Sequence, residues 1–413
     1  MSENIKPRIQ KLGTHSKILL LAVLFACTLR NVGLSIVDLG LPSFITELAG
    51  SLISYGIVIG IFSIMQSIFQ FPIAAASDKY GRRLIVLIAM SVYIIGTFLC
   101  FFAQTIAQLV IFRAIQGIGA YTSILQAMIG DIFKKERHGT GMGYYSLSLN
   151  IGYFSGIILG GYISSYLGFR HIFSISGGLI LLSTIFLLVV FKYDKFENAN
   201  KEQNNPGEQN NISLKRENIF KLLKDSEFNI TIFLNSTRWF IFGGIVAYLV
   251  WVLQEYYGFD EITSSYILII IVAFYVGFVI YSSRVLDKQG PKRMMVIGQL
   301  LAISFGFFFF FNFSKDFLVF IILTIAIGVG LALYDPAGST LLLDVIVEIE
   351  PNLKGTGIGF NNAIGFFFGA VGPIVICWLG EYNIFFPFYL IFFLILIAFI
   401  ITLTLIKEKH KDR

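Results

Sequence analysis

Long apolar runs, separated by short polar segments, dominate the chain. At 1.5 Å per residue, about 20 residues are needed for a helix to cross the roughly 30 Å hydrocarbon layer of a membrane. The runs are apolar on all sides rather than at every second residue, which excludes the strands of a membrane barrel. We expect twelve spans, at residues 17–40, 52–76, 84–103, 105–130, 141–167, 171–191, 228–254, 262–283, 294–313, 317–342, 355–379 and 384–406. The sequence therefore predicts an all-α polytopic membrane protein with twelve transmembrane helices.

The basic residues between these spans predict the orientation. With the N-terminus in the cytoplasm, 26 of the 31 lysines and arginines fall on the inner side. Arg170 and Lys315 fall outside, and three arginines lie within spans. Because inner loops of membrane proteins are enriched in Lys and Arg, we expect a cell-membrane protein with both termini cytoplasmic. The net charge of +6 then follows from topology, and no nucleic-acid partner is expected.

The composition argues against an enzyme or a pump driven by nucleotide hydrolysis. Only 14% of the residues are charged, compared with about 25% in soluble proteins. The sequence contains no P-loop motif and no His/Cys metal-ligand spacing, so neither a cofactor nor a metal is expected.

Leu24 to Cys27 loosely matches a lipoprotein cleavage site, but cleavage there would leave eleven spans and break the alternation of charge.

The chain divides into two similar halves. The polar segment 192–227 separates a six-helix bundle at 1–191 from a second at 228–413, and we interpret it as a cytoplasmic linker. The segment 78–83 (DKYGRR) has a counterpart 209 residues later at 287–293 (DKQGPKR). Gly-Thr-Gly-x-Gly at 139–143 recurs 216 residues later, at 355–359. These repeats indicate duplication of a six-helix unit, an architecture found in many secondary transporters.

Ionisable residues inside the spans are the candidate functional residues. A charge near the bilayer centre costs at least about 2.5–3.5 kcal/mol on insertion scales, so it usually faces a cavity or a partner. Arg30 and Asp38 lie on the first span, and the other three such residues lie on the fourth (Arg113), seventh (Arg238) and tenth (Asp335). Their recurrence on every third span predicts four related helices around one polar cavity. On the helical spacing, Asn31 shares a face with Asp38 and Gln116 with Arg113. The predicted substrate and proton pathway thus comprises Arg30, Asn31, Asp38, Arg113, Gln116, Arg238 and Asp335.

Several interpretations of these charges stay open from the sequence. The arginines could be structural only, and Asp335 could lie at a cytoplasmic vestibule. Three arginines against two aspartates favour an anionic substrate, or arginines that tune a carboxylate for proton coupling. The fifth span also carries small residues at four-residue spacing, which lets helix backbones approach closely. We expect a packing face formed by Gly143, Gly152, Gly156, Gly160 and Gly161.

Three motifs resemble the major facilitator superfamily. The segment 78–83 is similar to the loop motif between the second and third helices of that family, and 287–293 to its degenerate second copy. The RxxQGxGA segment at 113–120 resembles the fourth-helix motif of proton-coupled members. The glycines of the fifth span resemble the antiporter motif of the drug:proton antiporters, although Ile157 stands where that motif has proline.

The resemblance implies roles for these residues. Arg113 would take part in proton transfer. Asp78, Arg82 and Arg83 would form a cytoplasmic charge network that stabilises the outward-open state and breaks on switching. With Gly81 and, in the second copy, Asp287 and Gly290, they would make up the conformational-switch loops. Asp38 is our choice of protonatable carboxylate, by position rather than by motif.

We therefore expect a monomeric secondary transporter in the lipid bilayer, coupled to protons and exporting small amphipathic compounds by alternating access. Trp239, Tyr248 and Trp251 are candidates to stack on such ligands. The alternative is a symporter or uniporter of an anionic metabolite or a sugar. A receptor on the same fold would need a larger soluble domain than the longest loop provides.

Overall fold

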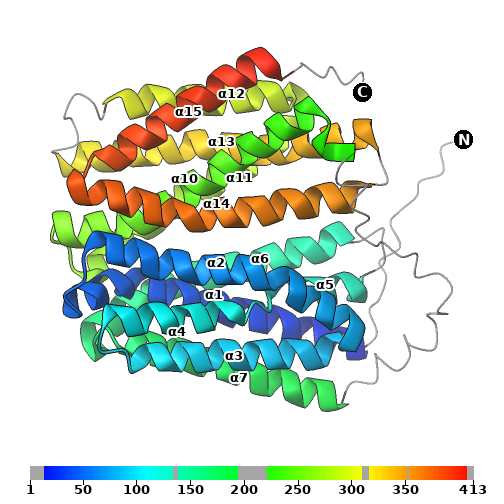
Figure 1. Ribbon diagram of the computed structural model, residues 1–413, viewed down its shortest axis with the longest axis vertical. Coiled ribbons are helices and arrows are strands. Elements are labelled where there is room, and N and C mark those ends of the chain that lie inside the picture. Colours follow the sequence, from blue (N-terminus) through cyan, green and yellow to red (C-terminus); the bar gives the residue numbers. More distant parts are fainter. Residues whose placement is uncertain (1–13, 134–137, 194–220, 309–315, 351–352, 407–413) are drawn as a thin grey trace, which may run out of the picture.

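The computed structural model describes residues 14–133, 138–193, 221–308, 316–350 and 353–406, whose regular structure is entirely helical. The helices lie side by side along one common direction (Figure 1). They are α1 (Thr14–Glu47), α2 (Leu52–Tyr80), α3 (Arg82–Phe101), α4 (Ile106–Ile118), α5 (Thr122–Ile132), α6 (His138–Leu167), α7 (His171–Tyr193), α10 (Ser226–Trp251) with the π-helix η2 (Val252–Tyr256), α11 (Glu261–Gln289), α12 (Pro291–Phe308), α13 (Phe317–Ile349), α14 (Lys354–Tyr382) and α15 (Phe386–Leu405). The predicted all-α fold is confirmed.

Ten of the described helices are long and apolar enough to cross a membrane. The two further spans that we expected correspond to α12 and to the pair α4 and α5.

Side chains that precede two of the helices cap their N-terminal ends. The carboxylate of Asp225 accepts a hydrogen bond from the Phe228 amide at the start of α10. Asp316 caps α13 in the same way through the Leu318 amide, which satisfies one of the free amides that every helix start leaves.

The expected single helix at 105–130 is wrong, because the chain breaks between α4 and α5. Gly117 and Gly119 lie against the backbones of α2 and α3: an added Cβ would come within 2.4 Å of the Phe62 carbonyl oxygen and 2.5 Å of the Tyr93 amide, respectively. Two glycines this close together also weaken helix propensity. The Tyr121 amide bonds instead to the Gly119 carbonyl, at 2.9 Å. Close packing against two neighbouring helices thus interrupts the hydrogen-bond ladder.

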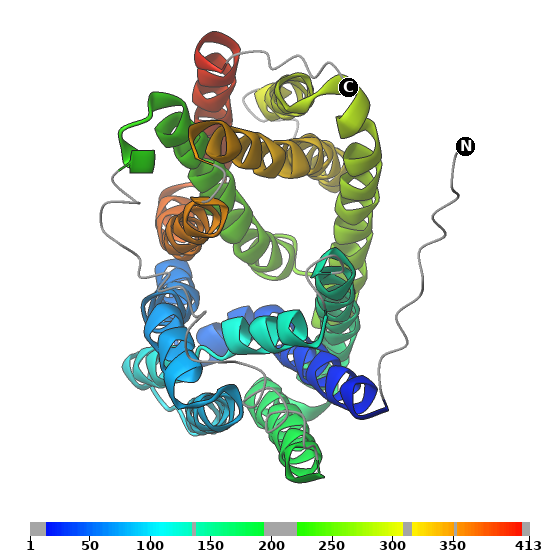
Figure 2. The same cartoon turned by 90° about the vertical axis from the view of Figure 1, so that its right-hand side faces the viewer.

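The helices form two groups with matching contacts, the N-terminal half (α1–α7) and the C-terminal half (α10–α15). Helix α1 packs on α6 as α10 packs on α14, and α2 on α4 as α11 packs on α13. Likewise α3 contacts α7 as α12 contacts α15. The halves meet mainly where α2 contacts α14 and where α6 contacts α11, as Figure 2 shows on its two sides.

The two loop motifs adopt the same turn in both halves. A single glycine joins α2 to α3 and α11 to α12, with φ of 98° at Gly81 and 79° at Gly290. These angles lie in the left-handed region, where a Cβ is unfavourable. The glycine of each motif therefore permits a one-residue reversal between antiparallel helices.

The described chain ends lie together at one end of the bundle, where α1 begins and α15 ends (Figure 1). We call this the inner end, after the orientation expected from the basic residues, and the opposite one the outer end. Helices α1, α6 and α10 run from the inner end to the outer end, and α2 and α11 run back.

Candidate transport site

Arg238 and Asp335 form an ion pair between α10 and α13, near the middle of both helices. Arg238 also donates a 3.0 Å hydrogen bond to the backbone carbonyl of Asp335. The side chain of Arg238 is 10% exposed and that of Asp335 is 34% exposed. The arginine is therefore enclosed, while the carboxylate keeps a free side.

Aromatic rings surround this ion pair. The hydroxyl of Tyr275 on α11 donates to Oδ2 of Asp335 at 3.2 Å, and its ring lies 5.4 Å from that of Phe242 on α10. The Arg238 guanidinium lies 5.7 Å from the centre of the Trp239 ring, within the range of a cation–π contact. The sequence analysis missed Tyr275, because a tyrosine in an apolar helix gives no signal of its own.

Arg113 on α4 is enclosed within the N-terminal half and is only 1% exposed. It donates to the Gln116 side chain at 2.6 Å and to the Val58 carbonyl at 3.4 Å. Gln116 donates in turn to the hydroxyl of Thr97 at 2.8 Å, and the guanidinium lies 4.4 Å from the centre of the Phe62 ring. The expected pair of Arg113 with Gln116 thus exists, inside the half rather than at a shared water-filled surface.

The charged residues of α1 lie in the same half. Arg30 donates to the Asn31 side chain at 3.1 Å, and Asn31 donates to the Leu149 carbonyl of α6 at 3.0 Å. Among the residues that the structure describes, Asp38 has no hydrogen-bond or ion-pair partner, although Arg113 and Arg30 both act on its carboxylate electrostatically. The five embedded charges therefore divide between the halves, with Arg30, Asp38 and Arg113 in one and the pair of Arg238 and Asp335 in the other.

At the inner end, Arg82 pairs with a carboxylate that the sequence analysis did not select. Its Nε lies 3.0 Å from Oδ2 of Asp131 at the end of α5, and Arg83 donates to the Phe191 carbonyl at 3.2 Å. Asp131 fell one residue beyond the expected fourth span, and its only signal was an acidic residue at a helix end. The side chains of Asp78 and Asp287 lie outside the described residues.

The glycines of α6 face two different helices. A Cβ on Gly152 or Gly156 would lie 2.4 Å from a backbone oxygen of α1, that of Thr28 or Val32, and Gly160 lies along the same contact. Gly161 instead faces the start of α11, where an added Cβ would lie 2.9 Å from the Glu261 carbonyl oxygen. The surroundings of Gly143 lie outside the described residues.

Hydrogen bonds between the two halves gather at the outer end. The Glu261 carboxylate accepts from Ser43 of α1 at 3.0 Å and from Ser165 of α6 at 3.3 Å. Further bonds join Thr46 to Glu255 and Tyr162 to Tyr266, both at 2.9 Å, and Tyr55 to the Ala247 carbonyl at 3.2 Å. The sequence analysis missed these residues, since polar side chains at helix ends are common.

The neighbour of Glu261 is also acidic. A hydrogen bond with the Thr263 side chain holds the pKa of Asp260 below its usual range, because the bond favours the charged carboxylate. Asp260 is the N-cap residue that precedes α11, so the exposed amides of the helix start also suit its charge. The start of α11 thus carries two carboxylates, of which Glu261 contacts the other half.

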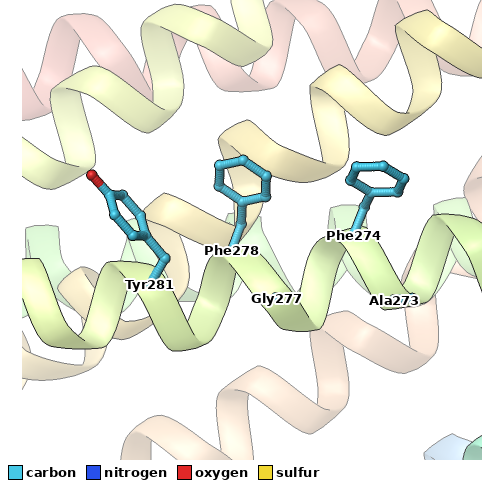
Figure 3. Close-up of a pocket in the computed structure, with 5 residues that line it drawn as sticks. All are labelled: Ala273, Phe274, Gly277, Phe278 and Tyr281. Atoms are coloured by element: carbon cyan, nitrogen blue, oxygen red, sulfur yellow. The ribbon is translucent and has the colours of Figure 1, made fainter.

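A separate apolar hollow of about 530 Å³ lies along α11. The rings of Phe274, Phe278 and Tyr281 point to the same side of the helix, next to Ala273 and Gly277 (Figure 3). On the helical spacing this side is about a quarter turn from Tyr275, and it shares no residue with the buried charges. It is not the polar site predicted from the sequence. Among the described residues, no group of His, Cys, Asp or Glu could hold a metal ion.

The sequence model of the Major Facilitator Superfamily matches residues 19–291 and 229–413. The chain therefore belongs to this superfamily of membrane transporters, whose members bind a small-molecule substrate within a lipid bilayer.

Two curated relatives illustrate the similarity. An uncharacterized transporter of Buchnera aphidicola is 26% identical over 64% of this chain and 66% of its own length. Multidrug resistance protein 3 of Bacillus subtilis is 36% identical over 28% of this chain and 23% of its own. The chain thus spans less than two thirds of either relative.

Among solved structures, a bacterial homologue of the human lysosomal transporter Spinster superposes with a TM-score of 0.78, covering 97% of this chain and 100% of that one. At 16% identity, this likeness shows the shared fold.

Proposed function

We propose that this protein is a proton-coupled secondary transporter that exports small amphipathic compounds by alternating access. The observation that carries the proposal is Asp38, a carboxylate inside a membrane-spanning helix with no described hydrogen-bond or ion-pair partner. Keeping an unpaired charge there is expensive, so taking up a proton relieves the cost. Asp38 is the proton carrier in this account.

Arg113 and Arg30 would couple the protonation of Asp38 to the conformation of the N-terminal half. Both arginines act electrostatically on the Asp38 carboxylate. When Asp38 is protonated, this attraction disappears and the balance between conformations changes, because a ligand shifts an equilibrium only through its differential affinity for the two states. Gln116 and Asn31, which hold the two guanidinium groups, are positioning residues in this account.

Alternating access requires that one end close while the other opens. The bonds from Ser43 and Ser165 to Glu261 support a closed outer end. With both termini in the cytoplasm, as the basic residues predict, this arrangement is inward-facing. The two halves, 1–191 and 228–413, would rock against each other across the contacts of α2 with α14 and of α6 with α11, joined by the linker 192–227.

Efflux of drug-like compounds is supported by the antiporter-type glycines of α6 and by the similarity to a multidrug resistance protein. The second candidate is a symporter or uniporter of an anionic metabolite or a sugar, favoured by the embedded arginines and by Ile157 in place of proline. The ion pair of Arg238 with Asp335 neutralises one of those arginines, which weakens the anionic alternative.

The experiment compares two transport modes in reconstituted vesicles. Asp38→Asn removes the titratable group, so uptake driven by a pH gradient should be lost while exchange of substrate for substrate continues. Arg113→Ala should also abolish driven flux while the protein stays in the membrane. Normal driven flux in Asp38→Asn would contradict the assignment of the proton to Asp38.

A further inference from the structure

One face of α10 combines polar and aromatic side chains. Asn235, Trp239 and Phe242 follow the spacing i, i+4, i+7 and so form a single stripe. Phe242 contacts Tyr275 of α11, and Trp239 contacts Phe366 of α14. Trp239 and Phe242 therefore lie between α11 and α14, whereas Asn235 is buried and bonds to Gly338 of α13 and Asn361 of α14.

The part of α10 that carries Trp239 and Phe242 faces the N-terminal half. Helix α14 packs against α2 and α11 packs against α6, and both α10 and α11 contact α1, so the space between α11 and α14 opens toward α1. Figure 2 shows α10 at the centre of this arrangement, with α14 on one side and α11 on the other. A compound passing between the halves would meet this face of α10.

Two aromatic pairs flank the ion pair on this face. The rings of Trp239 and Phe366 lie 5.4 Å apart, as do those of Phe242 and Tyr275. Phe242 is 40% exposed and Phe366 is 39% exposed. Gly365 lets the Trp239 ring lie against α14, since an added Cβ would be 2.6 Å from that ring. The rings of Phe242 and Phe366 thus stay partly exposed, while each is held in place by its contact with a second ring.

The centre of the face offers hydrogen-bond acceptors but no net charge. One Asp335 oxygen pairs with Arg238 and the other accepts from Tyr275. A carboxylate has about four acceptor positions, and the Asp335 side chain is 34% exposed. A ligand N–H or O–H can therefore bind there without displacing Arg238.

We infer that this face of α10, with Phe366 and Tyr275, is the substrate-recognition surface, and that it takes flat aromatic compounds carrying a hydrogen-bond donor. Such a ring packs on Trp239 and Phe242 while its donor binds Asp335. Aromatic stacking contributes about 0.5–1.5 kcal/mol per ring pair beyond its area. The inference rests on the proposed transport function and adds its substrate class.

The other aromatic candidates from the sequence lie elsewhere. Trp251 packs on Tyr55, 5.6 Å between ring centres, near the outer end. The hydroxyl of Tyr248 donates to the Ile384 carbonyl, and its side chain is fully buried. Only Trp239 of the three belongs to the proposed surface.

Tryptophan fluorescence gives a direct test, because the chain has only three tryptophans. The double variant Trp251→Phe/Trp378→Phe leaves Trp239 as the sole reporter. We expect proflavine, a flat aromatic amine, to quench its emission saturably, and xylose to leave it unchanged. Phe242→Ala in this background should weaken the apparent affinity about two- to twelvefold, as the loss of one stacked ring predicts.

The matched control is Trp239→Phe/Trp251→Phe, which leaves only the exposed Trp378 near Tyr382. Equal quenching in both single-tryptophan proteins, or none at Trp239, would overturn the inference. If a pH gradient drives proflavine transport but proflavine does not quench Trp239, this surface is rejected and the transport function is retained. Saturable quenching at Trp239 without driven transport would support the surface and reject proton coupling.

Discussion

Two buried arginines of this protein, Arg238 and Arg113, are satisfied in different ways. Arg238 has a carboxylate, whereas Arg113 has an amide, a backbone carbonyl and a phenyl ring. A guanidinium carries five donors in a rigid fork, so several neutral acceptors can replace one negative charge. The described contacts thus differ between the halves: Asp38 has no described hydrogen-bond or ion-pair partner in one, and Asp335 neutralises Arg238 in the other.

The ion pair can be tested by removing one partner. Asp335→Asn leaves Arg238 buried without its counter-charge, and breaking a buried pair in this way costs about 3–5 kcal/mol. We expect a lower melting temperature in detergent, measured by thermal denaturation. The double variant Arg238→Met/Asp335→Asn removes the uncompensated charge and should recover much of the loss. An unchanged melting temperature in Asp335→Asn would show that the pair contributes nothing to stability.

At the scale of helices, backbone contacts through glycine decide how the elements fit. Helix α6 lies on α1 through Gly152, Gly156 and Gly160, and Gly372 of α14 lies equally close to the Phe240 carbonyl of α10. Small residues at such positions allow helices to approach closely within a membrane. Close backbone contacts at glycine thus join α6 to α1 in one half and α14 to α10 in the other.

A bulky residue on α6 should separate it from α1. Gly156→Leu places its Cβ 2.4 Å from the Val32 carbonyl oxygen, and overpacking of this kind typically costs about 1–3 kcal/mol. We expect a reduced melting temperature and less folded protein after solubilisation. Gly178→Leu on α7 is the matched control, since nothing lies within 4 Å of a Cβ there. Equal stability of the two variants would contradict the packing role.

The spans could be predicted from the sequence because their lengths and hydropathy reflect the membrane itself. The break after Ile118 could not, because it depends on how closely α4 approaches α2 and α3. Periodicity places Arg238 and Asp335 on helix faces, but their pairing requires knowing which faces meet. For the same reason, Asp131 could not be predicted as the partner of Arg82.

For the whole molecule, the outer-end bonds hold the two halves together across a contact that would open in the proposed alternating-access cycle. Glu261 is central because its two oxygens bind serines from two helices of the other half. A hydrogen bond to a charged group contributes about 1.5–3 kcal/mol. Losing both bonds is enough to shift a two-state equilibrium strongly.

Glu261→Ala should favour opening of the outer end. We expect a single cysteine introduced at Val58, which is fully buried on α2, to react with a membrane-impermeant thiol reagent at least about tenfold faster in this variant. The native cysteines are replaced by alanine in both proteins. Glu381→Ala, which alters an exposed carboxylate near the same end on α14, is the control. Unchanged labelling in Glu261→Ala would exclude a latch at this position.

The central claim, that movement of protons through the N-terminal half drives transport, is tested most directly by transport in vesicles containing the purified protein. An imposed pH gradient should drive accumulation of an aromatic amine, and collapsing the gradient with a protonophore should abolish accumulation while substrate exchange continues. Accumulation that persists at the same rate without the gradient would contradict the account.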